Sequence, residues 1–246
     1  MLRRIRADLH VHTCLSPCAD LAMSPRTIAR EAQERNIGII AICDHNSAEN
    51  VPAVMRTAGA LGIAVLAGME VCTREEVHVL AIFGDAAGAF ALQSLVYDRL
   101  QGKNNPDVFG LQVVANEHDE VMGFQDRLLI GAADIPLERI VGEVHRLGGA
   151  AIAAHIDREV SSVISQLGFI PPGLRFDALE LSRNAPPEAT RGSFARYADF
   201  TFVRNSDAHF LHELGSNTSE YLLEGPTFDE MLKALHRSDG RRVLEE

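Results

Sequence analysis

The chain lacks the features that mark secreted and membrane-spanning proteins. Its 246 residues include only four cysteines, Cys14, Cys18, Cys43 and Cys72, and no two of them form a Cys-x-x-Cys pair. Such sparse cysteines argue against a disulfide framework and favour reduced thiols. No apolar run is long enough to span a bilayer, and the opening MLRRIRADLH has no hydrophobic signal-peptide core. The sequence therefore predicts a cytoplasmic protein with no membrane partner.

A surplus of positive charge is also absent, since the formal net charge is −11, from 34 acidic and 23 basic residues. Extended surfaces that hold nucleic-acid backbone are usually basic, so we expect no extended nucleic-acid surface. An anionic substrate is still compatible with this charge, because bound metal cations would reverse the field at the site that they occupy. The oligomeric state is left open.

Internal repeats and low-complexity linkers are absent too, and the length suits a single domain over residues 1–246. Short apolar runs recur at residues 5–11, 37–43, 63–71, 77–83, 150–154, 178–181 and 200–203, and helical patterns separate several of them. Continuous apolar strands that alternate with helices predict an α/β fold with a parallel sheet buried on both faces. Seven such strands suit a β/α barrel.

Three local signals refine this fold. Ser24 followed by Pro25 predicts a helix start, and Gly148–Gly149 predicts a helix end. Residues 101–133 depart from the alternation, because they hold two extended runs around an acidic turn. We predict a hairpin inserted into the barrel at this segment.

Polar residues with ligand chemistry follow most of the predicted strands. They are His10 and His12, Asp44 and His45, Glu70, His78, His155 and Asp157, Arg183, and Asp207 and His209. The carboxyl ends of barrel strands converge on one face, which is where barrel active sites lie. Residues two apart in a strand point the same way, roughly 6.5 to 7 Å apart, so each His-x-His or Asp-x-His pair can serve one ion.

The donors outnumber what one ion requires. Nitrogen and oxygen donors without an obligatory thiolate suit Zn²⁺, Mn²⁺ or Fe²⁺. One catalytic ion takes three or four protein ligands, so two or three divalent metal ions are expected. Glu70 is the natural bridge, because a carboxylate has two oxygens. We expect Asp8, Asp44 and Asp157 to orient ligating histidines by accepting their second N–H, and His118, His145, His212 and His236 to be structural or exposed.

The motifs DLHVHT, CDHN, GMEV, EVHVL, AHID and NSDAH together resemble the PHP family, the polymerase and histidinol phosphatase domains. The resemblance covers about residues 7–215 and implies a distorted seven-stranded (β/α)7 barrel with a trinuclear metal site. It implies His10, His12, Glu70 and Asp207 as ligands of the first ion, Glu70, His78 and His155 of the second, and His45 and His209 of the third. A further ligand of the third ion would come from the loop CLSPCAD, where Asp20 is the first choice and Cys18 the alternative.

The same resemblance implies a stand-alone metal-dependent phosphoesterase for a small phosphorylated molecule, a nucleotide, a phosphodiester or an oligonucleotide end. A metal-activated hydroxide would attack phosphorus, and Arg183, or after it Arg158, would bind the substrate and stabilise the developing charge. Asp207 or a metal-bound water would protonate the leaving group. The alternatives are a histidinol-phosphate-like phosphomonoesterase, a non-catalytic metal-binding regulatory module, and a metal-dependent C–N hydrolase.

Overall fold

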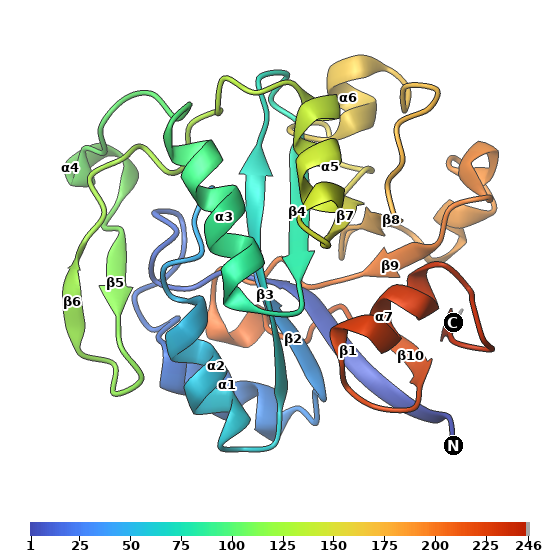
Figure 1. Ribbon diagram of the computed structural model, residues 1–246, viewed down its shortest axis with the longest axis horizontal. Helices are drawn as coiled ribbons and strands as arrows, with labels where there is room; N and C mark the ends of the chain where they lie inside the picture. The colour runs from blue at the N-terminus through green and yellow to red at the C-terminus, as the bar shows by residue number, and fades with distance from the viewer. Residues whose placement is uncertain (245–246) are drawn as a thin grey trace.

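The computed structural model describes residues 1–244, which form an α/β fold around one nine-stranded sheet (Figure 1). Its strands lie in the order β11-β10-β1-β2-β3-β4-β7-β8-β9. Their bounds are β1 Arg3–Val11, β2 Ile39–Ile42, β3 Ala64–Cys72, β4 His78–Phe83, β7 Ala150–Ala153, β8 Ala178–Leu181, β9 Phe202–Arg204, β10 Ser219–Leu223 and β11 Arg242–Leu244.

Seven of these strands form a nearly closed barrel. They run from β1 through β4 and β7 to β9, and residue Ala208 just after β9 returns to the end of β1. There the backbone N–H of His12 donates to the carbonyl of Ala208 at 3.0 Å, and the N–H of Ala208 donates to the carbonyl of His10 at 3.2 Å. The seven predicted strands are thus confirmed, and β10 and β11 extend the sheet outward from β1.

The strand that carries His78 departs from the expected parallel sheet. β4 is antiparallel to both β3 and β7. The connection between β3 and β4 spans only residues 73–77, whereas a parallel crossover needs a dozen residues or more. His78 therefore begins β4 rather than following it, and this places it at the same end of the barrel as the carboxyl ends of the parallel strands.

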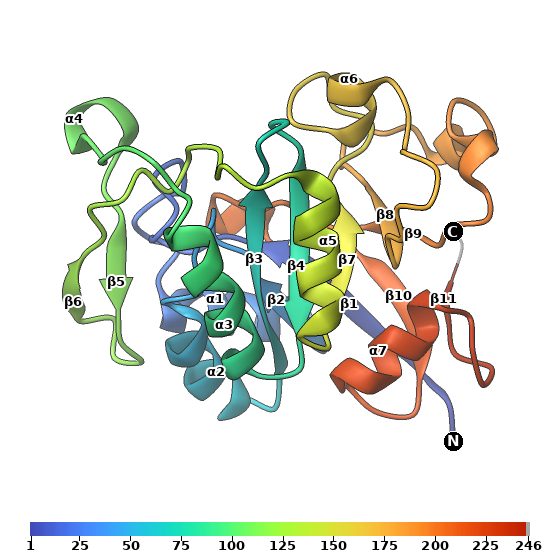
Figure 2. The same cartoon turned by 45° about the horizontal axis from the view of Figure 1, so that its top comes forward.

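Helices cover the outside of the barrel (Figures 1 and 2). The α-helices are α1 Pro25–Glu34, α2 Val51–Gly59, α3 Ala86–Tyr97, α4 Pro106–Phe109, α5 Leu137–Arg146, α6 Val163–Leu167 and α7 Phe228–Leu235, and the 3-10 helices are η1 Pro187–Thr190, η2 Ala195–Tyr197 and η3 Leu211–Glu213. The predicted helix start is confirmed, because Ser24 is the N-cap of α1 and Pro25 its first residue. Gly148, at a φ of 78°, lies just beyond α5. Among residues 1–244, no helix is both long enough and apolar enough to cross a bilayer.

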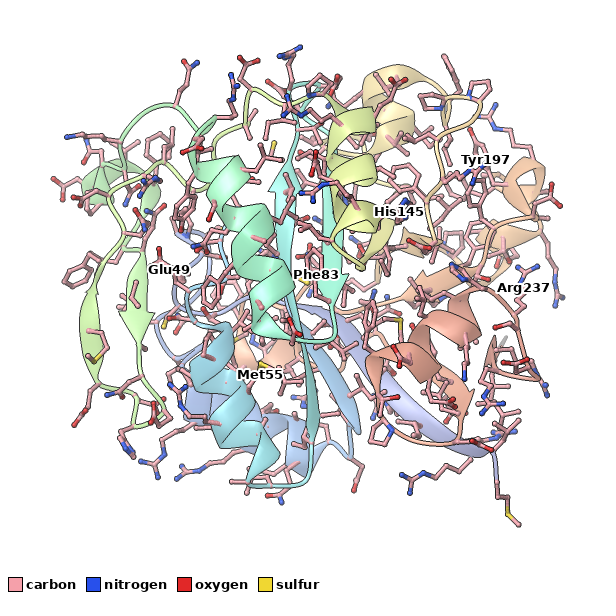
Figure 3. All side chains as sticks on the ribbon, in the orientation of Figure 1. Glu49, Met55, Phe83, His145, Tyr197 and Arg237 are labelled. Carbon is pink, nitrogen blue, oxygen red and sulfur yellow. The ribbon has the colours of Figure 1, made fainter. Side chains whose placement is uncertain are left out.

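The predicted hairpin lies beside the barrel as a separate two-stranded sheet of β5 (Val113–Ala115) and β6 (Val121–Phe124). The chain after β2 holds it in place. Asn50 Nδ2 donates to the carbonyl of Val113 at 3.0 Å. Glu49, which Figure 3 labels beside the hairpin, accepts from Gln125 Nε2 at 2.7 Å through Oε1. Asn46 Nδ2 also donates to the carbonyls of Leu129 and Gly131, at 2.7 and 2.8 Å. These bonds fix the end of the insertion close to His45.

Alternation along the strands separates two apolar clusters. In β4, Leu80 and Ile82 belong to an inner cluster with Ile152 of β7 and residues of α7, whereas Val79 and Ala81 belong to a second, outer cluster with residues of α1, α2, α3 and α5. His78 lies two residues before Leu80 and so shares its inward side. The inner cluster therefore forms a floor beneath the polar end of the barrel.

Candidate metal centre

Imidazole and carboxylate groups from separate strands meet at one end of the barrel. The ligand atoms form three overlapping groups, and within each group all atoms lie within 4.8 Å of one another. The groups are His10, His12, Glu70 and Asp207; His45, Glu70 and His78; and His12, His45 and His209. The structure thus brings together eight of the nine predicted ligands when His155, described below, is included.

The first group surrounds a small polar volume. Nε2 of His10 and Nε2 of His12 lie 3.2 and 3.1 Å from Asp207 Oδ1, and each lies 3.5 Å from a Glu70 oxygen. All four side chains are buried. Burial raises the pKa of the Asp207 carboxyl, but the neighbouring His10 and His12 outweigh this effect and hold its pKa well below the ordinary value. This favours the carboxylate form of Asp207, which can bind a cation, and its roles as a ligand and as a proton donor stay predictions.

Glu180 orients His10, and the sequence analysis did not identify this residue. His10 Nδ1 lies 3.1 Å from both carboxylate oxygens of Glu180. Glu180 also accepts from Asn205 Nδ2 at 2.7 Å and from the backbone N–H of His155 at 2.8 Å. An N–H at Nδ1 leaves the Nε2 lone pair of His10 free for a cation. The sequence does contain one indication of this role, because Glu180 interrupts the apolar strand ALEL. A Glu that is fully buried is almost always paired with a partner.

Asp44 acts on His12 through a serine. Ser16 Oγ donates to Asp44 Oδ1 at 2.7 Å and lies 2.9 Å from His12 Nδ1. Since the hydroxyl proton goes to Asp44, Ser16 accepts the Nδ1 proton of His12, and the Nε2 lone pair again faces the cluster. The expectation that Asp44 accepts directly from a histidine is wrong.

Asp8 and Asp157 do not contact a ligating histidine either, contrary to expectation. Asp8 accepts from the backbone N–H and the hydroxyl of Ser206, at 3.0 and 2.6 Å. Asp157 accepts from the backbone N–H and the hydroxyl of Ser182, at 2.7 and 2.6 Å. Both carboxylates fix loops beside the site, since a nearby hydroxyl and backbone N–H satisfy their two oxygens.

Glu70 occupies the centre of the site. One of its oxygens, Oε1, lies 2.7 Å from His78 Nδ1 and 3.0 Å from His155 Nε2, and the other lies 3.0 Å from His45 Nδ1. Burial raises the pKa of Glu70, but His78, His10 and His45 outweigh this and keep the pKa well below the ordinary value. An ionised carboxylate with imidazoles at both oxygens has the geometry of a bridging ligand.

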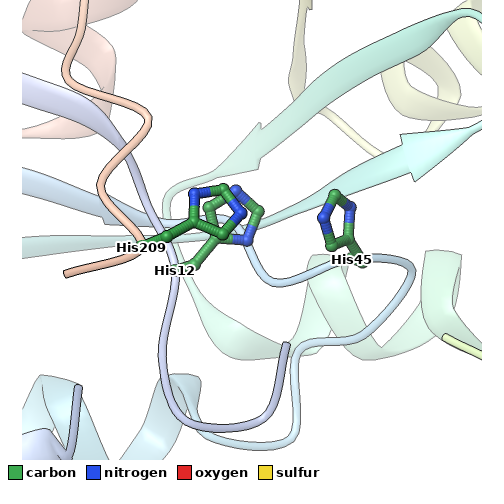
Figure 4. A group of neighbouring side chains, drawn as sticks. All are labelled: His12, His45 and His209. Carbon is green, nitrogen blue, oxygen red and sulfur yellow. The ribbon is translucent and has the colours of Figure 1, made fainter. Parts of the chain in front are cut away.

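The third group is His12, His45 and His209, and the loop after β1 was predicted to add Asp20 or Cys18 to it. The rings of His12 and His209 stack at 4.1 Å, and the His45 ring faces them at 4.7 Å from His12 (Figure 4). The Asp20 side chain is exposed and accepts from the N–H of Ala22 at 2.8 Å, so it is not brought to this group.

Cys18, in the same loop, is also exposed, and its sulfur is in none of the three ligand-atom groups. Partial burial raises the pKa of its thiol, but the nearby His209 and His45 outweigh that and lower the pKa to about 6. A thiol with a pKa this low is largely thiolate at neutral pH, which is the form that binds metals.

Two ligands have left-handed backbone conformations. His155 has a φ of 29° and Asp207 a φ of 50°, a region that residues other than glycine seldom adopt. Such conformations cost on the order of 1–3 kcal/mol each and persist where the surrounding structure imposes them. Here they turn the chain at the ends of β7 and β9 so that both side chains face Glu70.

The two candidate arginines occupy different places. Arg158 lines the cavity above the cluster, and its Nη2 contacts Asp207 Oδ2. Arg183 Nη1 pairs with Glu213 Oε1 at 2.7 Å and is not among the residues that line the cavity. Glu213 accepts in turn from the backbone N–H of His209 at 2.9 Å. A direct phosphate contact by Arg183 stays a prediction, whereas Arg158 is already at the cavity.

The site opens into a cavity of about 470 Å³. Cluster residues form its floor, and Ile130, Gly131 and Ala132 from the end of the insertion form part of its wall. The donor set fits divalent ions, because lone pairs of several imidazoles converge on ionised carboxylates, and His155 Nδ1 is buried with no hydrogen-bond partner among residues 1–244. Oxygen and nitrogen donors of this kind suit Zn²⁺, Mn²⁺ and Fe²⁺.

Two family models match the chain. The model described as PHP domain matches residues 8–167, and one described as PHP-associated matches residues 191–239. The protein therefore belongs to the PHP family, as its motifs indicated. The first match ends with the last residue of α6, and the second runs from just after η1 to just beyond α7.

Three relatives are informative. The 5'-3' exoribonuclease Rnm of Salmonella typhimurium (strain LT2) is 25% identical over 194 residues, which are 61% of this chain and 65% of the exoribonuclease. The lesion-specific endonuclease Q of Pyrococcus furiosus has a TM-score of 0.75 at 18% identity, over 98% of this chain and 58% of that one. Endonuclease Q in complex with a 27-mer duplex substrate has a TM-score of 0.74 at the same identity and coverage. This chain thus spans less than two thirds of the length of these relatives.

The family match and these solved structures confirm the barrel fold. The relatives are by name an exoribonuclease and an endonuclease, the latter bound to a duplex substrate, and they overturn the expectation of a small-molecule partner with no extended nucleic-acid surface. That expectation rested on a net charge of −11. Net charge sums over the whole surface, whereas bound cations and local basic groups set the field where a strand lies. The cytoplasmic location stays a prediction.

Proposed function

We propose that this protein is a metal-dependent nuclease that hydrolyses phosphodiester bonds in nucleic acid. The observation that carries the proposal is the convergence of three overlapping ligand groups on Glu70 at the floor of an open cavity that Arg158 also lines. The nuclease activities named for the exoribonuclease and for endonuclease Q support it.

Two or three divalent ions would be held by the three groups, with Glu70 shared between two of them. When bound, such ions supply a water of lowered pKa as nucleophile and neutralise the charge on the phosphate. The protein fixes the ligands beforehand: Glu180 and Ser16 hold His10 and His12 with their Nε2 lone pairs inward. His209 Nδ1 lies 3.0 Å from the carbonyl of Asp207, and this contact fixes its ring in the same way.

Arg158 would bind the scissile phosphate. Its guanidinium borders both the cavity and Asp207, so Nη2 is held in place while the other donors would be available to a substrate oxygen. A planar guanidinium matches two phosphate oxygens at once. The side chain is 36% exposed, which leaves room for that contact.

Cys18 would complete the third ligand group with His45 and His209, in place of Asp20. The nearby His209 and His45 lower the pKa of the thiol, which favours the thiolate form that binds metals. A thiolate is a softer donor than a carboxylate and shifts the preference of that position toward Zn²⁺ or Fe²⁺ over Mg²⁺.

The test is hydrolysis of end-labelled single-stranded RNA, single-stranded DNA and duplex DNA by protein loaded with Mn²⁺, Zn²⁺ or Fe²⁺. We expect phosphodiester cleavage of at least one of these, and a loss of about 10³-fold or more in the Glu70→Gln variant, because the bridge and the charge that holds the ions are both removed. Glu76→Gln is the matched control, since Glu76 lines the same cavity outside the ligand groups. Absence of cleavage of every nucleic acid by protein that carries two or more ions would overturn the proposal.

A further inference from the structure

A second cavity lies on the outside of the barrel, between α1, α2 and the turn of the β5–β6 hairpin. Its volume is about 440 Å³, and it shares no lining residue with the metal-site cavity. Its lining consists of Arg26, Ala29, Arg30, Arg56, Thr57, Ala60, Leu61, Glu117 and His118. Figures 1 and 2 both show the hairpin turn beside α1 and α2, away from the arrowhead end of β3.

The lining is basic in a chain that is acidic as a whole. Three guanidinium groups face one carboxylate, although the net charge is −11. Arg56 Nη2 pairs with Glu117 Oε2 at 2.8 Å. Within the described residues 1–244, the guanidinium groups of Arg26 and Arg30 have no hydrogen bond or ion pair. The guanidinium groups of Arg26 and Arg30 are thus available to bind an anionic ligand.

The positions of these two arginines are unfavourable for α1 alone. Arg26 and Arg30 are four residues apart and so lie on one face of the helix, where like charges repel each other. Arg26 also lies in the first turn of the helix, where its dipole favours negative charge. A bound anion would relieve both effects.

The cavity is held open by specific contacts. The backbone N–H of Arg26 donates to Asp119 Oδ1 at 2.9 Å, which fixes the hairpin turn against the start of α1. Thr57 Oγ1 lies 3.2 Å from the carbonyl of Pro25, so α2 packs beside the same helix end. His118 is presented from the turn at the exposed rim.

We propose that this arginine-lined cavity binds a backbone phosphate of the nucleic-acid substrate at a distance from the scissile bond. The inference rests on the proposed function, and it adds to it a second contact that holds the strand on the outside of the barrel. Guanidinium groups bind phosphate through paired, charge-assisted hydrogen bonds. The contact carries no base specificity, because it reads only the phosphate.

The test is the affinity for a fluorescent single-stranded oligonucleotide as a function of salt, measured by anisotropy with all variants made in the Glu70→Gln background to prevent cleavage. A phosphate contact on a single strand contributes about 0.7 to the slope of log affinity against log salt, which at 0.1 M salt is about fivefold. Replacing both Arg26 and Arg30 with Gln removes the contact with this one phosphate, so it should weaken binding about fivefold and lower the slope by about 0.7.

Two further variants sharpen the test. Glu117→Gln removes the one lining carboxylate and frees Arg56, so binding should tighten, by up to about fivefold. Arg3→Gln is the matched control, because Arg3 is an exposed arginine on β1 that does not line the cavity, and it should change nothing. Hydrolysis of bis-p-nitrophenyl phosphate, measured without the Glu70 change, should be equal in all these variants if the fold is intact.

The inference is overturned if the double variant binds the oligonucleotide as tightly as its parent, or if the parent does not bind it. It is also overturned if the double variant loses only the binding of inorganic phosphate, measured by calorimetry, since the cavity would then serve a free anion. These outcomes are distinct from failure of the proposed function, which is judged by nucleic-acid cleavage in the protein with Glu70 intact.

Discussion

Replacing Glu180 with Gln should weaken metal binding without disturbing the fold. The carboxylate is 1% exposed and accepts from three donors: His10 Nδ1, Asn205 Nδ2 and the backbone N–H of His155. A Gln has one acceptor oxygen, so its amide group must face at least one of these donors. Either a buried donor loses its partner or His10 moves its proton to Nε2, which removes the lone pair that binds the ion.

The expected size follows from the burial. An unsatisfied buried donor costs about 1–3 kcal/mol of folding stability, so the variant should unfold at a lower temperature but remain folded. Loss of an orienting partner of a metal-binding His costs about 10- to 100-fold. The assay is calorimetric titration of metal-stripped protein with Mn²⁺ or Zn²⁺, with thermal unfolding as the check on the fold.

Asp157→Asn is the matched control for this prediction. Asp157 is also a carboxylate beside the site, but both of its oxygens accept from Ser182. The variant should retain metal affinity within a few-fold. A Glu180→Gln protein with the metal affinity of the parent, or an Asp157→Asn protein with an equal loss, would refute the reasoning.

Three other perturbations test separate parts of the account. Cys18→Ser should remove the sulfur-to-cobalt charge-transfer absorption of Co²⁺-loaded protein and weaken one ion, because a thiolate ligand is lost; an unchanged spectrum would exclude Cys18 as a ligand. Arg158→Ala should raise KM for an oligonucleotide by about tenfold or more while the ions stay bound, since a charge-assisted contact is lost; unchanged kinetics would exclude the contact. The hydrogen bond with Arg241 lowers the pKa of Glu230 to about 2, so the ionised Glu230 should stabilise the fold at neutral pH. Because its folded pKa lies below the ordinary 4.5, this stabilisation is present above pH 4.5 and is lost as pH falls toward 2. The free energies of urea unfolding of Glu230→Gln and the parent should therefore differ at pH 7 and converge at low pH. A difference that does not shrink at low pH would contradict this prediction.

The strands and most of the ligands could be predicted because each carries a local signal. Continuous apolar runs end in His, Asp or Glu, and barrel closure brings those ends together whatever the details of packing. The orientation of β4 could not be derived from a parallel-sheet rule, although the short connection after Cys72 limits it. β10 and β11 were missed because they are short, and β10 alternates buried and exposed residues at the outer part of the sheet.

The partners of the ligands were less predictable, because they depend on register across the barrel. Asp8 and Asp157 lie two residues from ligating histidines, yet both bind a serine from a different strand end. Glu180 lies on β8, and it is 170 residues from His10 in the sequence. Cys18 and Asp20 lie two positions apart in one loop. Asp20 closes a turn with the backbone of Ala22, which the spacing in the sequence does not reveal.

The central claim is that ions held around Glu70 hydrolyse nucleic acid. Its most direct test is stepwise addition of Mn²⁺ to metal-stripped protein, with bound metal and cleavage of an end-labelled oligonucleotide followed in the same samples. We predict that cleavage begins only once two ions are bound per chain, because catalysis needs the pair that Glu70 bridges. Glu70→Gln should not cleave at any metal level. Cleavage by the stripped protein, or by Glu70→Gln at the rate of the parent, would contradict the account.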